Sequence, residues 1–269
     1  MRYLFIVCFL LCCLCSVAQK SAFPYQLNKS DYFILPLGLG SKAFAWSIEN
    51  NQAQLPYNTM QSLNRNCINF FDKSATNKWN TGLDELSEIG KYGIVASPAI
   101  VLLSLGKNKQ WNNSLIYGVM YFEVALVTVG FTDLSKAIIQ RKRPYLYNPS
   151  LSNIEKQKLI SSEGGQDSFF SGTTSISFAS AVFLSKTVTD IYGKGILSKI
   201  VWTSSLTLAS TVAYLRYESG QHFPTDIIAG AAVGSAIGYF IPVLHKKNSK
   251  LKNTTLIVLP NSATLAYRF

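Results

Sequence analysis

An arginine, a histidine and an aspartate are concentrated in residues 216–226, although the whole chain contains only two histidines. Pro224 prevents a regular helix from running through His222, and an apolar run follows, so we expect the histidine in a loop at the start of a helix. There, Asp226 can accept the Nδ1 proton of His222 and leave Nε2 as a nucleophile or a base, while Arg216 holds an anion beside it. The alternative is a purely structural His–Asp pair.

Two further clusters have the chemistry of an anion site. Lys136 and Arg143 lie seven residues apart, which is two helical turns, so both side chains can point at one anion. Ser171 and Gly172 open an apolar run, where a hydroxyl and the free N–H groups of a helix start favour phosphate. Each cluster alone also has an ordinary explanation, as lipid-headgroup contacts or as a simple helix cap. Together with the histidine they predict a site for a tetrahedral oxyanion under nucleophilic attack.

The elements that must position these clusters are long apolar segments. The 269 residues are 48% hydrophobic and only 14% charged, which is more apolar than an average soluble domain. Apolar helices are expected at residues 92–106, 114–132, 169–184, 196–215 and 227–244. In an up-and-down arrangement of these helices, the three clusters emerge on one face. The predicted fold class is all-α, a helical bundle of five to six apolar transmembrane helices with a short C-terminal β-like tail.

Two features of the helices predict how they pack. Glu123 lies near the centre of residues 114–132, and an ionisable group there usually faces the bundle interior, where a buried hydrogen bond to a neighbouring helix is its expected role. Gly230, Gly234 and Gly238 recur every four residues, which predicts a seam of close packing along one helix face.

The chain divides into four predicted parts. Residues 1–18 have a charged start, an apolar core and a small-residue cleavage site, as in a secretory signal peptide, with an uncleaved anchor as the rival interpretation. Residues 19–90 form an exported or interfacial region, in which the apolar residues 32–48 either span the membrane or lie in its interface. A possible helix at residues 83–89 would be capped by Thr81. Residues 91–247 form the helical domain, and residues 248–269 a tail whose alternation is typical of strands.

Charge and cysteine content exclude several functions. Four of the five cysteines lie in the signal segment, so a mature chain retains only Cys67 and has neither an internal disulfide nor a cysteine-rich metal site. The net charge of +11 comes from lysines in short clusters rather than along one helix face, which favours anionic membrane or phosphate over nucleic acid as the partner. Most of these lysines lie away from the three clusters. By the positive-inside tendency, we expect a bacterial inner-membrane protein whose site faces the periplasm or exterior.

The three clusters resemble the three-part signature of the type 2 phosphatidic acid phosphatase and vanadium haloperoxidase superfamily. The first part is Lys136, six residues, then Arg143-Pro144. The second part, normally Pro-Ser-Gly-His, is here Phe170-Ser171-Gly172-Thr173. The third, normally Ser-Arg, five residues, His, three residues, Asp, is here Leu215-Arg216, five residues, His222, three residues, Asp226. The resemblance in helix order extends over residues 92–244.

The resemblance implies a mechanism. His222 would attack phosphorus to give a phosphohistidine, and Asp226 would orient it. No metal or other cofactor is implied, and the substrate would be a phosphorylated lipid. The residues that would cradle the phosphate oxygens are Lys136, Arg143, Ser171, Gly172 and Arg216.

Thr173 departs from the family pattern, because it stands where a second histidine protonates the leaving group. A threonine hydroxyl is not an acid near neutral pH, and losing a general acid costs about a hundred- to ten-thousand-fold in rate for a poor leaving group. A phosphoanhydride would suffer less. We therefore expect a slow enzyme, one that prefers lipid diphosphates, or one that recruits Glu163, Asp167 or Glu218 as the acid. His245 should lie at the opposite end of the bundle and cannot substitute.

The sequence thus predicts a membrane phosphatase, a phosphoric monoester or diphosphate hydrolase acting on lipids. Two other functions remain open. A non-enzymatic protein that binds phosphorylated lipid is favoured by Thr173. A vanadate-dependent haloperoxidase would share the oxyanion site, although the short membrane-like helices and the missing acid histidine argue against it.

Overall fold

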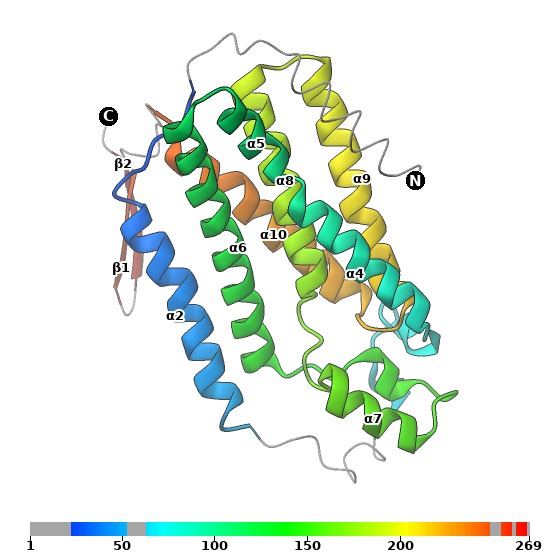
Figure 1. The fold of residues 1–269 in the computed structure, drawn as a ribbon. Coiled ribbons are helices and arrows are strands. Elements are labelled where there is room, and N and C mark those ends of the chain that lie inside the picture. Colours follow the sequence, from blue (N-terminus) through cyan, green and yellow to red (C-terminus); the bar gives the residue numbers. More distant parts are fainter. Residues whose placement is uncertain (1–22, 53–62, 248–253, 260–261, 268–269) are drawn as a thin grey trace.

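The computed structural model describes residues 23–52, 63–247, 254–259 and 262–267, so the predicted signal peptide lies outside the described residues. Within them the chain forms a bundle of long helices that run side by side, with a small β-hairpin beside one end (Figure 1). The hairpin pairs β1 (Thr254–Leu259) with β2 (Ser262–Tyr267) in antiparallel register. The all-α class with a short β tail is confirmed. The helices are α2 (Asp31–Glu49), α4 (Thr81–Ala96), α5 (Ala99–Lys107), α6 (Trp111–Ile139), α7 (Asn153–Glu163), α8 (Gly172–Tyr192), α9 (Ile196–Glu218) and α10 (Pro224–His245).

Four segments of the described chain are long and apolar enough to cross a membrane: Thr81–Lys107, Trp111–Tyr147, Ile196–Glu218 and Pro224–His245. The helix α8 is enclosed by α4, α6, α9 and α10, and many of its buried residues are serines and threonines. The expected five to six helices correspond to the four segments, α8 and α2. Residues 32–48 lie within α2, which continues through Pro36, and the two interpretations of that segment stay open.

The first apolar helix differs from the prediction of residues 92–106. It begins at Thr81 because the Asn80 side chain accepts a hydrogen bond from the Leu83 N–H at 3.0 Å, so Asn80 and not Thr81 is the cap. It breaks before Pro98, whose ring nitrogen has no hydrogen to donate, and α5 continues from there. The predicted domain boundary between residues 90 and 91 therefore falls inside α4.

The glycine seam holds α10 directly against α8. A Cβ atom at Gly230, Gly234 or Gly238 would lie 2.6, 2.0 or 2.3 Å from a main-chain carbonyl oxygen of α8. The Ser171 N–H, at the start of α8, also donates to the carbonyl oxygen of Asp226 at 3.1 Å. The predicted seam is confirmed, and it brings the starts of the two helices together.

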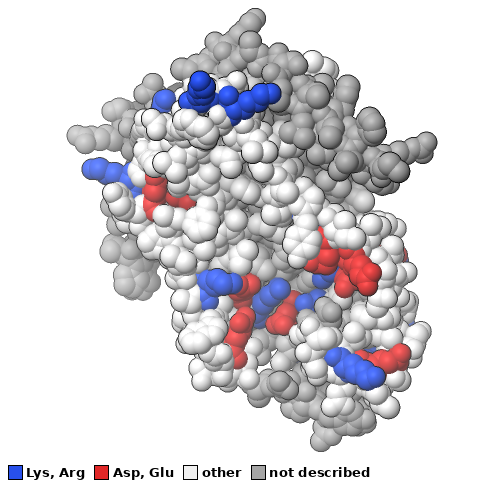
Figure 2. Space-filling view, viewed as in Figure 1, with Lys and Arg blue, Asp and Glu red and all other residues white. Residues whose placement is uncertain are grey.

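The outer surface of the bundle is suited to lipid. Figure 2 shows one face on which charged side chains gather toward the two ends, with a mostly uncharged belt between them. Large apolar side chains are exposed along the membrane-crossing segments. Examples are Ile89, Leu103, Phe122, Ile228 and Phe240.

The seam predicts opposite effects for two glycine substitutions. Gly234→Ala should lower the melting temperature in detergent by several degrees, because forcing a methyl group into a packed contact costs about 1–3 kcal/mol. Gly93→Ala is the matched control, since a Cβ at Gly93 meets nothing within 4 Å, and alanine favours a helix by about 0.5–1 kcal/mol over glycine. Thermal unfolding of both variants tests the seam. Equal melting temperatures would contradict it.

Candidate active site

His222 lies in the turn between α9 and α10, where it is buried. The preceding Gly220 has φ of 76°, and a Cβ there would lie 2.1 Å from the Lys78 carbonyl oxygen, so this tight turn needs glycine. Pro224 then begins α10. The predicted position of the histidine, in a loop at a helix start, is confirmed.

The tautomer of His222 is set by a main-chain carbonyl. Nδ1 lies 2.8 Å from the carbonyl oxygen of Ser168 and 3.8 Å from Asp226 Oδ2. A carbonyl only accepts hydrogen bonds, so Nδ1 carries the proton and Nε2 keeps its lone pair. The prediction that Asp226 accepts the Nδ1 proton is wrong, because the segment before α8 lies against the ring and takes that place.

Asp226 forms its hydrogen bonds with residues that surround His222 and not with the imidazole. Its Oδ2 accepts the Ser168 hydroxyl at 2.6 Å and the Phe223 N–H at 2.9 Å, and its Oδ1 accepts from Arg141. The Asp226 carboxylate therefore links Ser168, whose carbonyl oxygen accepts from the imidazole, to Phe223, the residue that follows His222.

A second buried carboxylate extends this network. Asp72 Oδ2 lies 2.7 Å from Arg141 Nη2, and Asp72 also accepts from the Thr225 hydroxyl at 2.7 Å and the Thr225 N–H at 3.0 Å. Burial raises the pKa of Asp72, but the hydrogen bonds from Arg141, Asn69 and Thr225 outweigh it and lower the pKa. The segment between α2 and α4 thus anchors the start of α10, a contact for which the sequence held no signal.

Three cations surround the imidazole. Arg143 and Arg216 are each 6% exposed, and they come from different ends of the sequence signature. Lys136 Nζ lies beside Gly172, 3.8 Å from where a Cβ of that residue would be. Burial lowers the pKa of His222 well below its usual value, and the nearby charges of Arg143, Arg216 and Lys136 lower it further, against the opposing Ser168 hydrogen bond.

The two arginines differ in their partners. Arg143 donates from Nη1 to Gln221 Oε1 at 2.6 Å, while its buried Nε has no hydrogen-bond partner among the described residues. Arg216 pairs with Asp84 of α4 and lies 3.6 Å from Glu88 Oε1. Gln221 Nε2 donates to Asp84 Oδ2 at 3.1 Å and so links the two.

Ser171 and Gly172 begin α8, as predicted, but the helix starts at Gly172 rather than at residue 169. The Ser171 side chain accepts from the Thr174 N–H at 3.4 Å and caps the helix. The cap leaves the helix start facing Lys136, which lies beside Gly172. All three predicted clusters are therefore brought to one end of the bundle.

Thr173 donates its hydroxyl hydrogen to Glu88 Oε1 at 3.1 Å. Glu88 also pairs with Lys91 of the same helix. Thr173, Lys91, Lys136 and Gly172 line one cavity of about 220 Å³. At the position where the sequence resemblance leads one to expect an acid histidine, the structure thus has a threonine bound to a carboxylate from α4.

Of the acids suggested by the sequence, the two whose side chains the structure describes, Asp167 and Glu218, have other neighbours than Thr173. Glu218 pairs with Lys78 at 2.7 Å, and the Asp167 carboxylate lies against Gly164. The side chain of Glu163 lies outside the described residues. His245 ends α10 and is about 30 Å from the start of that helix, so its predicted distance from the site is confirmed.

The geometry agrees with the family comparison. A family model described as the PAP2 superfamily matches residues 116–250, which include all three clusters. A lipid A 4'-phosphatase of Bacteroides thetaiotaomicron is 30% identical over 173 residues, 62% of this chain and 71% of that protein. A lipid A 4'-phosphatase of Porphyromonas gingivalis is 26% identical over 55% of this chain and 58% of its own length. A PA-phosphatase related-family protein of Dictyostelium discoideum is 32% identical over 45% of each chain, so for these last two proteins the match spans less than two thirds of their length.

A solved structure also aligns with the chain. It is the transmembrane PAP2 type phosphatidylglycerolphosphate phosphatase from Bacillus subtilis, with 17% identity, a TM-score of 0.38, and coverage of 78% of this chain and 90% of that chain.

The surroundings of His222 predict its titration. Because its pKa is lowered, the imidazole should stay neutral at and above pH of about 6.5, the usual histidine value. Below that pH the unfolded chain binds the proton first, so the stability that the neutral group contributes is present above about 6.5 and is lost as the pH falls. NMR of the imidazole signals in micelles, assigned with His222→Ala, measures this directly, since the chain has two histidines. Titration of His222 at or above about pH 6.5 would contradict the prediction.

Proposed function

The chain belongs to the PAP2 superfamily, and within this family of membrane lipid phosphatases we propose that it hydrolyses a lipid phosphate or diphosphate through a phosphohistidine intermediate. The observation that carries the proposal is the state of His222. Its Nδ1 proton is held by a main-chain carbonyl, which leaves the Nε2 lone pair available, and the charges of Arg143, Arg216 and Lys136 act on the imidazole. A neutral imidazole beside guanidinium groups is arranged to attack an anion that those groups bind.

The proposed reaction has two steps. Nε2 of His222 forms a bond to phosphorus while the bond from phosphorus to the leaving oxygen breaks, and that oxygen keeps the electron pair. Arg143, Arg216 and Lys136 stabilise the negative charge on the phosphoryl oxygens. Water then attacks the phosphohistidine, and the phosphorus–nitrogen bond breaks to return the neutral imidazole and inorganic phosphate.

The groups that we place beside the leaving oxygen are Thr173, Glu88 and Lys91. The Thr173 hydroxyl hydrogen is engaged by Glu88, and Glu88 is itself paired with Lys91 and close to Arg216. A carboxylate between two cations stays ionised and is a poor acid. Lys91 lines the same cavity as Thr173, and we assign it the role of stabilising the departing oxygen by its charge. This arrangement favours leaving groups that need no proton, such as the phosphate of a lipid diphosphate.

The substrate and its side of the membrane follow from the same features. Two relatives are named as lipid A 4'-phosphatases, so the 4'-phosphate of lipid A is the first monoester to test, beside phosphatidate and a polyprenyl diphosphate. The lysines at the end of the bundle away from His222, among them Lys107 and Lys109, favour a cytoplasmic position for that end. The site would then open toward the periplasm or exterior.

The phosphatase proposal predicts which single substitutions abolish activity. His222→Ala should eliminate vanadate-sensitive phosphate release from the purified full-length protein in lipid micelles. Lys136→Ala should reduce release by about a hundredfold, the typical cost of one lost oxyanion contact. Lys107→Ala is the matched control, because Lys107 also lies in the last turn of a helix but at the other end of the bundle.

Three outcomes of that assay separate the functions. Release that survives in His222→Ala would refute the nucleophile. Lipid binding without release from any substrate would identify a non-enzymatic phospholipid-binding protein, which Thr173 favours. Halide oxidation that requires added vanadate would identify a haloperoxidase.

The leaving-group arrangement predicts a gain of function. Thr173→His should raise hydrolysis of the monophosphate lipid at least about tenfold, because a general acid typically contributes about a hundred- to ten-thousand-fold. Hydrolysis of the diphosphate should rise less. Thr173→Ser, which keeps a hydroxyl for Glu88, is the control and should leave both rates near those of the parent. An unchanged monophosphate rate in Thr173→His would count against a missing acid.

A further inference from the structure

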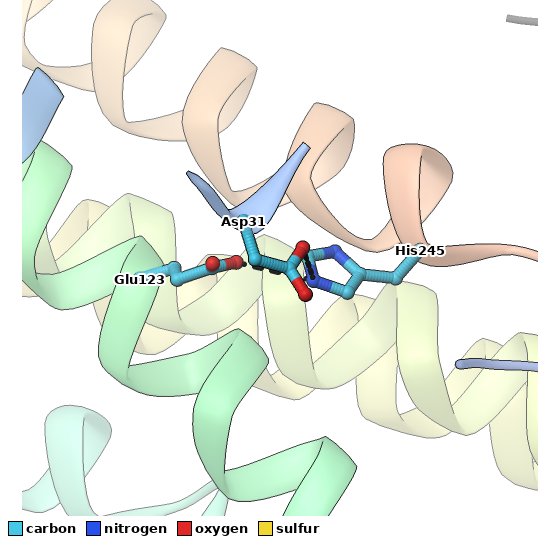
Figure 3. A group of neighbouring side chains, drawn as sticks. All are labelled: Asp31, Glu123 and His245. Atoms are coloured by element: carbon cyan, nitrogen blue, oxygen red, sulfur yellow. Dashed lines mark ion pairs between the residues drawn. The ribbon is translucent and has the colours of Figure 1, made fainter. Parts of the chain in front are cut away.

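Three chemistry-bearing side chains that the phosphatase reaction does not use meet at the other end of the bundle. Asp31 begins α2, Glu123 lies within α6 and His245 ends α10, and Figure 3 shows their polar atoms pointing at one another. His245 Nε2 lies 2.9 Å from Asp31 Oδ1 and 3.2 Å from Glu123 Oε2. Glu123 and His245 are completely buried, and Asp31 is partly buried. Glu123 faces the interior, as predicted, but it meets an imidazole.

The three side chains of this cluster offer more hydrogen-bond acceptors than donors. His245 Nδ1 lies 2.9 Å from the Ile241 carbonyl oxygen, so Nδ1 carries a proton. In the neutral imidazole, Nε2 is then an acceptor that faces two carboxylates. Both oxygens of Glu123 are buried and have no hydrogen-bond donor among the described residues. A buried carboxyl group of this kind is stable when a cation balances its charge or when it holds a proton.

Neighbouring lysines do not supply that cation. Lys246, next to the histidine, reaches Asp190 at 2.8 Å. Lys247 donates to the Phe23 carbonyl oxygen at 2.9 Å. A proton on Nε2 would give a single donor for two carboxylates and would leave the cluster with a net negative charge in a buried place. A divalent ion balances both carboxylates and accepts all three lone pairs.

We propose that Asp31, Glu123 and His245 bind a divalent transition-metal ion of the zinc class. The separations of 2.9 and 3.2 Å from Nε2 to the two carboxylate oxygens are slightly shorter than the edges of a tetrahedral shell, in which bonds of about 2.0–2.2 Å place neighbouring ligands about 3.3–3.6 Å apart, so small side-chain movements would admit the ion. An imidazole with two carboxylates suits zinc or a similar ion, whereas calcium and magnesium prefer oxygen alone.

Outer contacts hold the ligands in place, as in established metal sites. The Ile241 carbonyl fixes the imidazole tautomer that leaves Nε2 free to bind. The Asn28 N–H donates to Asp31 Oδ2 at 2.9 Å, and the Ser30 hydroxyl donates at 3.3 Å to Oδ1, the oxygen that faces the imidazole. Main-chain groups thus orient His245 and Asp31, and Glu123 is held in place by its complete burial.

The ion has a structural task at this position. It joins α2 to α6 and α10, and α2 already approaches α6 so closely that a Cβ at Gly130 would lie 2.5 Å from the Gly38 carbonyl oxygen. The site lies about 30 Å from the start of α10, where the phosphate would bind. The ion would fasten the N-terminal helix to the bundle without taking part in hydrolysis.

Metal content and thermal stability test the site without an activity assay. The full-length protein, purified in detergent and stripped with a chelator, should bind close to one equivalent of Zn²⁺ by elemental analysis. Added Zn²⁺ should raise its melting temperature saturably by several degrees. Glu123→Gln and Asp31→Asn should each lose the bound ion and the shift. Asp133→Asn, an acidic position on the same helix as Glu123, is the control and should keep both.

The partly buried Asp31 provides the second variant if Glu123→Gln does not fold. Co²⁺ in place of Zn²⁺ should give visible absorption that disappears in Asp31→Asn. Failure of the parent protein to bind Zn²⁺, Co²⁺ or Mn²⁺, or equal binding by Asp31→Asn and the parent, would overturn the metal site and would leave a protonated His245 between the carboxylates. Neither result would bear on phosphate release.

Discussion

The contact of the α10 glycine face with the main chain of α8 is the constraint on which the site depends. Because Gly234 leaves no room for a side chain, the two helices meet at backbone distance over three successive turns. This places the N-terminal end of α8 beside that of α10, where Ser171 bonds to the carbonyl of Asp226. The residues just before α8 then reach His222, because the Ser168 carbonyl oxygen lies 2.8 Å from its Nδ1. Side-chain chemistry is positioned here by helix packing.

The charges around the two histidines suit them to opposite proposed roles. In both, Nδ1 is bound to a main-chain carbonyl, Ser168 for His222 and Ile241 for His245, so both present the Nε2 lone pair. Around His222 the three cations outnumber the carboxylate of Asp226, which would suit an anion that the imidazole attacks. Around His245 the neighbouring charges are carboxylates, which suits a cation that the imidazole can bind. In the two proposals, the same tautomer would serve a nucleophile at one end of α10 and a metal ligand at the other.

The sequence predicted what depends on local spacing. The clusters containing Lys136, Ser171 and His222 and the glycine repeat of α10 were all identified, because helix periodicity places residues of fixed spacing on known faces. Partners supplied by distant segments were missed. Asp72 and Glu88 come from a polar region that carries no motif, and Ser168 contributes a main-chain oxygen, which every residue possesses. A carbonyl that displaces Asp226 from the imidazole leaves no trace in residue identity, and the start of α4 was misplaced because Asn80 caps it.

The region before the signature therefore determines how the signature works. The helix α4 supplies Asp84 to Arg216 and Glu88 to both Arg216 and Thr173. An arginine shared with two carboxylates is held rigidly but has part of its charge offset, so it positions a phosphoryl group more than it attracts one. Arg143 bonds to the neutral amide of Gln221 rather than to a carboxylate, so in the proposed reaction more of its charge is left for an incoming anion. In the proposed reaction the two arginines would therefore divide the work, with Arg143 drawing the phosphate in and Arg216 setting its orientation against His222.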